Sequence, residues 1–329
     1  MGMTVFLGGV SFPPDNKAGD GIAQPVTGEP GWQTSRIPLP GVPANATLLI
    51  ALNWFSVEFA GADRPFHRLA AQTRVRRDGA DALVSVRAGI RDASGAWDDG
   101  YRASVAFYVI ALDGAWSGAS TELSLPSAHH EHPTKGGATT PEVELPAGRE
   151  AVYFLSGFEV GFTSTNRGLR ELLVRVEPQS RRVGAGDGSV FWSARAVAGV
   201  RDDTGYWDDA YDATLSVGCI RPPAGALHRT AVGSLHGLNA GPARSARCLG
   251  VQGKRNATLI AMSSLKLAYL AQERPVRAVQ LGVAPMSNYR VGDDTAPIEL
   301  EFRGALRDHS GNWDDPYGAE LVAEILSDV

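Results

Sequence analysis

One eleven-residue pattern recurs three times along the chain and limits what the sequence can fold into. It reads R-D-x-[ST]-G-x-W-D-D-x-Y and occupies residues 91–101, 201–211 and 307–317. So many specified positions, recurring at similar intervals, indicate copies of one structural unit. The sequence therefore predicts three homologous modules in tandem.

Apolar and polar residues alternate on both sides of each pattern. A period of two on either side of a glycine-containing turn predicts a β-hairpin with one buried face. Strict alternation places Ile90 and Tyr101 on the inner face, whereas the loop resets the register and leaves the direction of Trp97 open. The alternating apolar positions around the first copy are Val84, Val86, Ala88, Ile90, Tyr101, Ala103, Val105, Phe107 and Val109.

A second alternating signature lies upstream of each hairpin, at residues 55–59, 158–162 and 265–269. Together with short opening strands, it predicts five or six strands in each copy and no long amphipathic helix. Because a lone antiparallel pair is marginal, we expect each copy to close as a two-layer structure around its own core. The predicted fold is all-β, with three tandem antiparallel β-sandwich or small-barrel modules that can pack around a pseudo-threefold axis.

Module boundaries are predicted from segments rich in Gly, Ser, Ala and Pro. Residues 113–140 and 221–246 have this composition, and we interpret them as linkers or long loops. The expected modules are residues 1–125, which include an N-terminal extension, residues 126–235 and residues 236–329.

Charge and hydropathy argue against two classes of function. The 329 residues include 31 Lys and Arg against 36 Asp and Glu, and a net charge of −5 is not typical of a nucleic-acid-binding protein. No apolar run approaches the roughly 18 residues of a membrane span. The first residues lack the basic and apolar parts of a signal peptide, which predicts cytoplasmic synthesis and leaves association with a virion or another assembly open.

The two cysteines, Cys219 and Cys248, are too few for a disulfide framework. Each falls on a predicted strand, and we interpret both as small buried apolar residues. A single bridge between them is left open.

The acidic and aromatic hairpin tip is the best candidate for a ligand site. A tryptophan or tyrosine ring offers a flat apolar face to a sugar ring, and carboxylates accept hydrogen bonds from hydroxyl groups. The candidate ligand-binding residues of the three copies are Trp97, Asp98, Asp99, Tyr101, Trp207, Asp208, Asp209, Tyr211, Trp313, Asp314, Asp315 and Tyr317.

The same loops carry oxygen ligands that suit Ca²⁺, because this cation prefers carboxylate and carbonyl oxygens supplied by turns. Calcium is the one cofactor that the sequence suggests. The candidate metal ligands are Asp92, Asp98, Asp99, Asp202, Asp208, Asp209, Asp308, Asp314 and Asp315.

A structural explanation of the same pattern carries more weight. Asp and Gly supply the geometry of a hairpin turn, and the arginine that opens each copy (Arg91, Arg201 or Arg307) can fork onto an aspartate and pin the loop. The tryptophan would then cap the end of the sandwich. Repetition does not separate the two explanations, since a folding element and a binding site would both be copied with the module.

Other motifs carry less chemistry. The stretch His129-His130-Glu131-His132 could bind a transition metal, but a flexible polar loop is the favoured interpretation. Asp78 and Asp81 precede a long strand at the opposite end from the hairpin tip and are interpreted as a solvated turn. We find no nucleophile elbow, phosphate-binding loop or zinc-protease motif, and we therefore expect no enzymatic activity.

These observations lead to one expected function and one alternative. The expected function is a non-catalytic multivalent binding protein, lectin-like or fibre-tip-like, that recognises a glycan or a protein surface through three repeated loops. The alternative is a structural or assembly subunit of a virion or an injection-type machine, without a small-molecule ligand. Both are compatible with a homo-oligomer.

Overall fold

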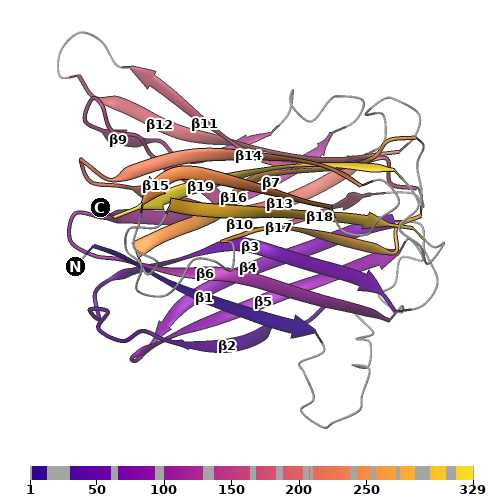
Figure 1. The fold of residues 1–329 in the computed structure, drawn as a ribbon, viewed down its shortest axis with the longest axis horizontal. Coiled ribbons are helices and arrows are strands. Elements are labelled where there is room, and N and C mark those ends of the chain that lie inside the picture. Colours follow the sequence, from indigo (N-terminus) through magenta and orange to yellow (C-terminus); the bar gives the residue numbers. More distant parts are fainter. Residues whose placement is uncertain are drawn as a thin grey trace.

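The computed structural model describes most of the chain as antiparallel β-strands (Figure 1). The described residues are 2–12, 30–60, 66–92, 100–128, 137–163, 168–182, 188–202, 207, 210–237, 243–252, 257–271, 275–285, 297–308 and 316–328.

The strands form three sheets, named here in the order in which the chain enters them. The first sheet has the order β1 (Met3–Phe12), β6 (Tyr101–Leu112), β3 (Thr47–Phe59), β17 (Ala278–Pro285), β18 (Pro297–Arg307) and β15 (Ala243–Gln252). The second sheet has the order β2 (Gln33–Pro38), β5 (Asp81–Asp92), β4 (Phe66–Asp78), β10 (Val152–Phe162), β13 (Tyr211–Arg221) and β7 (Ser117–Ala128). The third sheet has the order β14 (Leu227–Gly237), β19 (Tyr317–Ser327), β16 (Thr258–Tyr269), β11 (Glu171–Arg182), β12 (Val190–Arg201) and β8 (Ala138–Thr139), with β9 (Val143–Leu145) also on β12.

The prediction of an all-β antiparallel fold is confirmed, and its small-barrel alternative is wrong. In the described part of the chain, each sheet is open and ends in strands that are paired on one side, because strands from a distant part of the sequence extend the sheet instead of closing it on itself. The sheets pack face to face in a sandwich-like manner: β3 lies against β4 and β5, β10 against β11 and β12, and β16 against β17 and β18.

Every sheet joins strands that are distant in the sequence. Strands β1–β6 contribute to the first and second sheets, β7–β13 to the second and third, and β14–β19 to the third and first. We call the pairs that join them seams: residues 54–58 of β3 pair with 278–282 of β17, residues 68–72 of β4 with 157–161 of β10, and residues 171–175 of β11 with 264–268 of β16. Hydrogen-bonded backbone therefore connects all three strand groups.

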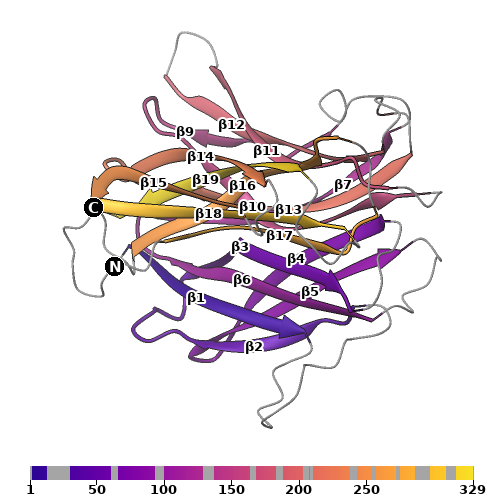
Figure 2. The same cartoon turned by 45° about the vertical axis from the view of Figure 1, so that its right-hand side comes forward.

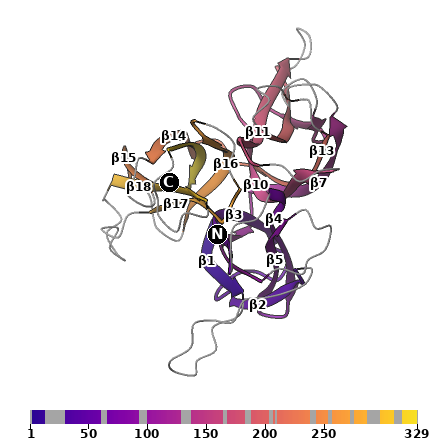
Figure 3. The same cartoon turned by 90° about the vertical axis from the view of Figure 1, so that its right-hand side faces the viewer.

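The apolar interior follows the predicted alternation but is not divided into separate cores. Ile90 is 1% exposed, and Tyr101 and Phe107 are fully buried, as expected for the inner face. Buried side chains of all three strand groups belong to one continuous cluster. At its centre the strands β3, β10 and β16 contact one another, as the view along the molecule shows (Figure 3). The expected division at residues 125 and 235 stays a prediction, although both positions lie within strands, β7 and β14.

The segments interpreted as linkers contain edge strands. Residues 113–140 include β7, and residues 221–246 include β14, each hydrogen-bonded along one side. An edge strand needs buried residues on only one face, and in β14 the small or apolar Ala231 and Leu235 fill that role between exposed polar positions. The small and polar residues of β7 and β14 therefore resemble the composition of a loop.

Each central strand is interrupted by a β-bulge at a buried polar residue. The register shifts at Asn53 in β3, at Ser156 in β10 and at Ser263 in β16. These residues are at most 3% exposed. The Ser156 hydroxyl donates to the backbone oxygen of Ile50 at 2.6 Å, so its polar group is satisfied inside the molecule. A bulge bends its strand and increases the local twist, which lets each central strand face two sheets.

Two further expectations can be compared with the described residues. Cys219 is a buried free thiol, whose pKa desolvation raises to about 11, and the side chain of Cys248 lies outside the part that the structure describes. In the described part of the chain, no helical segment combines the length and hydropathy of a bilayer span.

Replacement of Phe107 tests the inner face of β6. We expect Phe107→Ala to lower the free energy of unfolding by about 3–5 kcal/mol, because the fully buried ring leaves a cavity. Leu7→Ala on β1 is the matched control, since Leu7 is 57% exposed and its loss should cost less than about 0.5 kcal/mol. Denaturant melts measure both, and a loss below about 1 kcal/mol for Phe107→Ala would contradict the assigned face.

Candidate functional site

The structure places the bases of the predicted hairpin sites but not their tips. Trp97, Asp98, Asp99, Asp208, Asp209, Trp313, Asp314 and Asp315 lie outside the described residues, as do His129, His130 and His132. The binding role of these tips therefore stays a prediction. The described members are one tryptophan, the three tyrosines and the three opening aspartates.

Trp207 is half-buried at the base of the second hairpin. Its ring packs against the core, with the Arg201 guanidinium 5.4 Å from the ring centroid and the Tyr211 ring 6.3 Å away in an edge contact. Cation–π and edge-to-face contacts of this kind hold an aromatic ring in place. Trp207 therefore supports the hairpin base and keeps part of its surface open.

The tyrosines and the opening aspartates are buried. Tyr101 is fully buried, and Tyr211 and Tyr317 are 2% exposed. The Tyr317 hydroxyl donates to the backbone oxygen of Gly304 at 2.8 Å and accepts from the Ala243 N–H at 2.9 Å, so it ties three strands together. Asp92, Asp202 and Asp308 are at most 8% exposed. These rings and carboxylates would reach a ligand only after rearrangement of the hairpin base.

Calcium binding is not tested by the described residues. Among them, no three His, Cys, Asp or Glu side chains come together as a metal site. At the opposite end, Asp78 and Asp81 both pair with Arg36, at 2.5 and 3.5 Å, in a partly solvated turn.

Each seam carries one carboxylate held by two cations. In the second sheet, Glu159 accepts from Arg68 at 2.9 Å and from Arg87 at 2.7 Å. In the third sheet, Glu171 lies 2.8 Å from Arg201 and 3.0 Å from Lys266. The corresponding set in the first sheet is Glu58 with Arg307 and Arg277. Side chains from different strand groups therefore lock the seams on their outer faces.

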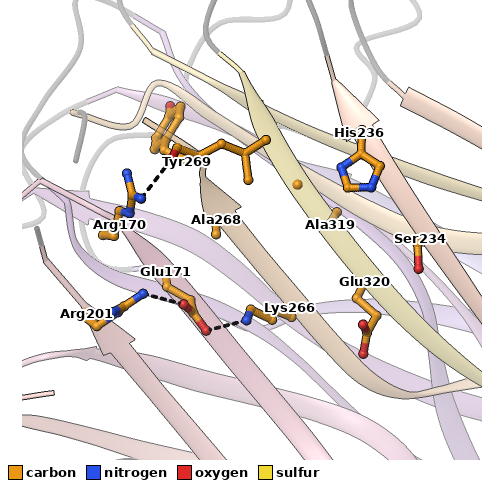
Figure 4. Close-up of a pocket in the computed structure, with 12 residues that line it drawn as sticks. Arg170, Glu171, Arg201, Ser234, His236, Lys266, Ala268, Tyr269, Ala319 and Glu320 are labelled. Carbon is orange, nitrogen blue, oxygen red and sulfur yellow. Dashed lines mark hydrogen bonds and ion pairs between the residues drawn. The ribbon is translucent and has the colours of Figure 1, made fainter. Parts of the chain in front are cut away.

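A hollow on the outer face of the third sheet opens beside the ion pairs that Glu171 makes with Arg201 and Lys266 (Figure 4). We call it the shallow pocket. It has a volume of about 350 Å³. Gly318 and Ala268 line it, together with His236, Lys266 and Glu320 on neighbouring strands. Arg170 closes one end through a 2.9 Å hydrogen bond to the backbone oxygen of Leu270.

Small residues are the reason that this pocket is open. The position after the hairpin tyrosine is Gly318 in the third copy but Asp212 in the second. In the second sheet, Arg68 bonds Asp212 at 2.6 Å and lies across the equivalent place. A Cβ added to Gly318 would meet only ordinary contacts, the nearest being 3.4 Å from Leu270. The third sheet therefore keeps free space where the second sheet has a salt bridge.

A second cavity, which we call the splay cleft, lies where β11 leaves β16. The two strands pair only over the seam, and the far ends of β11 and β12 then rise away from β14, β19 and β16 (Figures 1 and 2). The resulting cleft has a volume of about 510 Å³ and is lined by Trp192, Ser264, Pro178 and Glu320, among others. In the first sheet the residue after the bulge is Trp54, whose indole occupies the space over Gly282.

A buried charge network forms one wall of the splay cleft. Glu324 is 5% exposed and accepts from Ser263 at 2.7 Å, from Thr230 at 2.8 Å and from His228 Nε2 at 2.8 Å. Burial alone would lower the pKa of His228, but the hydrogen bond and negative charge of Glu324, aided by Glu150, outweigh it and raise the pKa. The network is thus an internally compensated ion pair.

This network does not have the geometry of a nucleophilic catalyst. Both ring nitrogens of His228 face carboxylates, Glu324 at 2.8 Å and Glu150 at 3.5 Å. The Ser263 hydroxyl donates to Glu324 rather than to the imidazole, whereas an activated serine needs a base at hydrogen-bond distance. The linings of the two cavities carry hydroxyl, carboxylate, amine and aromatic groups.

In comparisons with known proteins, no family model and no curated protein matches the sequence.

The hairpin motif predicted a site at the loop tips and not on the outer face of the third sheet. Lys266, Glu171 and Glu320 resemble ordinary exposed strand positions, and alternation predicts only that they point outward. The available signal was divergence between copies, namely Gly318 against Asp212 and Ser264 against Trp54. Such differences become informative once the strands are aligned.

The charged network predicts a pH-dependent contribution to stability. Because the folded state raises the pKa of His228, protonation stabilises the fold fully below the ordinary value of 6.5, and this contribution is lost as pH rises through the raised value. We expect the stability difference between the wild type and His228→Gln to be largest below pH 6.5 and to shrink as pH rises. His236→Gln, at an exposed position of the same strand, is the control. Denaturant melts across pH measure both, and a pH-independent difference would contradict the assignment.

Proposed function

We propose that this protein is a rigid, non-catalytic binding protein for polyhydroxylated ligands, with glycans as the ligand class. The observation that carries the proposal is the shallow pocket, an open hollow at a sheet position that a salt bridge fills in the second sheet. Its volume lies in the range of ordinary small-ligand sites. Donors and acceptors stand on paired strands, so little conformational entropy is lost when a ligand binds.

The chemistry of the shallow pocket suits hydroxyl groups. Lys266 and Arg201 donate, while Glu171 and Glu320 accept, and the two signs are interspersed around the hollow. The apolar Ala268 and Leu270 give the carbon face of a sugar ring a surface to pack on. Glu171, Arg201 and Lys266 are already paired with one another, and a neutral sugar can share their remaining hydrogen-bonding capacity.

We also propose that the chain consists of three copies of one unit of six or seven strands, arranged around a pseudo-threefold axis. Support comes from the recurring sheet order and from bulges at corresponding residues, Asn53, Ser156 and Ser263. The seams place the described hairpin bases at one end of the molecule, because β3, β10 and β16 all end beside Tyr101, Tyr211 and Tyr317. In this proposal the three loops present a multivalent face, with Ca²⁺ as a candidate ligand of their aspartates.

Filling the shallow pocket tests the proposal. We expect the wild type to bind glycans on an array and in calorimetry, and Gly318→Val to weaken binding at least about tenfold because its side chain occupies the hollow. Thr214→Val, at an outward position of β13 two residues beyond Asp212 in the second sheet, is the matched control. Titrations in Ca²⁺ and in chelator separate a pocket-based contribution from a loop-based one. Absence of glycan binding under both conditions would overturn the proposal.

An assembly role is the second candidate, and exposed sheet edges favour it. Strand β1 ends the first sheet with one side unpaired, and its Leu7 is 57% exposed. An unpaired edge is a template for strand addition from another chain. If assembly is the function, native mass spectrometry at high concentration will show rings or fibres, and Leu7→Lys will reduce them. A protein that stays monomeric, with unchanged mass in the variant, would exclude this role.

A further inference from the structure

The shallow pocket and the splay cleft lie on one continuous face of the third sheet. Glu320 lines both cavities. Along β19, Gly318 belongs to the pocket and Glu324 to the cleft, and a strand rise of about 3.4 Å per residue separates these positions by about 20 Å. Val322 of β19 also lines the cleft, and on the adjacent strand β14 the paired Val232 is 38% exposed. The two hollows are thus consecutive along the same strands.

The splay cleft has a donor without an acceptor in the described part of the chain. Trp192 lines the cleft, and its indole N–H is buried without a hydrogen-bond partner among the described residues. A buried polar group usually has a partner, because leaving it unpaired costs free energy. The apolar face of the same ring, together with Pro178, provides a packing surface. Both features suit a ligand that carries an oxygen acceptor beside a carbon face.

The charges around the cleft favour a neutral ligand. Glu324 already accepts from Ser263, Thr230 and His228, which leaves little free capacity on its carboxylate. On the rim, Arg175 pairs with Glu177 at 3.2 Å. A cation would therefore compete with groups that are already compensated, whereas hydroxyl groups can add hydrogen bonds to the exposed parts of these pairs.

The cleft is also open where the first sheet is closed. Corresponding positions after the bulge hold Trp54 in β3 and Ser264 in β16. Trp54 fills the space over Gly282, while Ser264 stands opposite Arg175 and leaves the cleft open. The small residue at position 264 thus has the same effect on the cleft as Gly318 has on the pocket.

We propose that the splay cleft is a second subsite, so that the third sheet binds an extended oligosaccharide along β19 rather than a single sugar. This inference rests on the proposed glycan-binding function and specifies its ligand. The shallow pocket holds one end of the oligosaccharide, and the face of Trp192 packs against a sugar unit further along it. After a local shift of the ring, the buried indole N–H donates to an oxygen of that unit.

The test compares the affinities of oligosaccharides of increasing length. The probes are homo-oligosaccharides of glucose, N-acetylglucosamine and mannose, from one to about six units, titrated by calorimetry against the full chain. In the series that binds, we expect affinity to rise at least about tenfold from one unit to four. Trp192→Ala should remove this rise, while Trp32→Ala, which replaces a 39% exposed tryptophan elsewhere, should keep it.

A second variant keeps the test decisive if Trp192→Ala does not fold. The double variant Ser264→Trp with Arg175→Gly recreates the Trp54–Gly282 arrangement and closes the cleft while preserving strand pairing. It should bind four units no more tightly than one. Wild-type binding that does not depend on length would overturn the inference and leave the proposed function standing. Failure of every probe to bind, on the array as well, would overturn the proposed function and the inference with it.

Discussion

Backbone pairing across the seams is the interaction on which the rest of the structure depends. Each seam joins two strand groups by a short antiparallel ladder, and a carboxylate between two cations covers its outer face. Without this pairing, β3, β10 and β16 would each have an unpaired edge at the centre of the molecule, where the continuous apolar cluster excludes water. The ion pairs are partly buried and add orientation more than stability. The backbone hydrogen bonds satisfy polar groups that have no other partner there.

The shortness of the seams explains where the cavities lie. Beyond Arg175 and Gln72 the inner strands continue without pairing across the seam, and side chains decide whether the space between them is filled. Trp54 fills it in the first sheet, while the second and third sheets keep cavities of about 340 and 510 Å³. The same backbone plan therefore yields a plugged site and open sites through single residues. Such a scaffold can alter its surface without altering its core.

Much of the fold follows from local pattern, and the part that does not has a physical reason. Alternation correctly placed Ile90, Tyr101 and Phe107 inside, because a strand has a period of two whatever its partner. Alternation could not show that β17 pairs with β3, since the choice of a partner strand from another strand group depends on tertiary packing. Alternation also did not predict β7 and β14. Each of these edge strands pairs with a single neighbouring strand, and their small and polar residues resemble those of a loop. The alternation pattern does not predict the candidate site, because this site results from the small side chains at Gly318 and Ala268. Their effect is seen only when the position is compared with the one that carries Asp212 in the second sheet.

The three sheets join the strand groups in a circle, the first group to the second, the second to the third and the third back to the first. In a linear repeat protein, units can be added or lost at the ends, because each unit contacts only its neighbours. Here no group is terminal: every inner strand already has its partner, and a fourth unit would find no seam to join. The closed circuit therefore fixes the number of strand groups at three. The side chains of each group can vary, but a further group could enter only if one of the three seams were first broken.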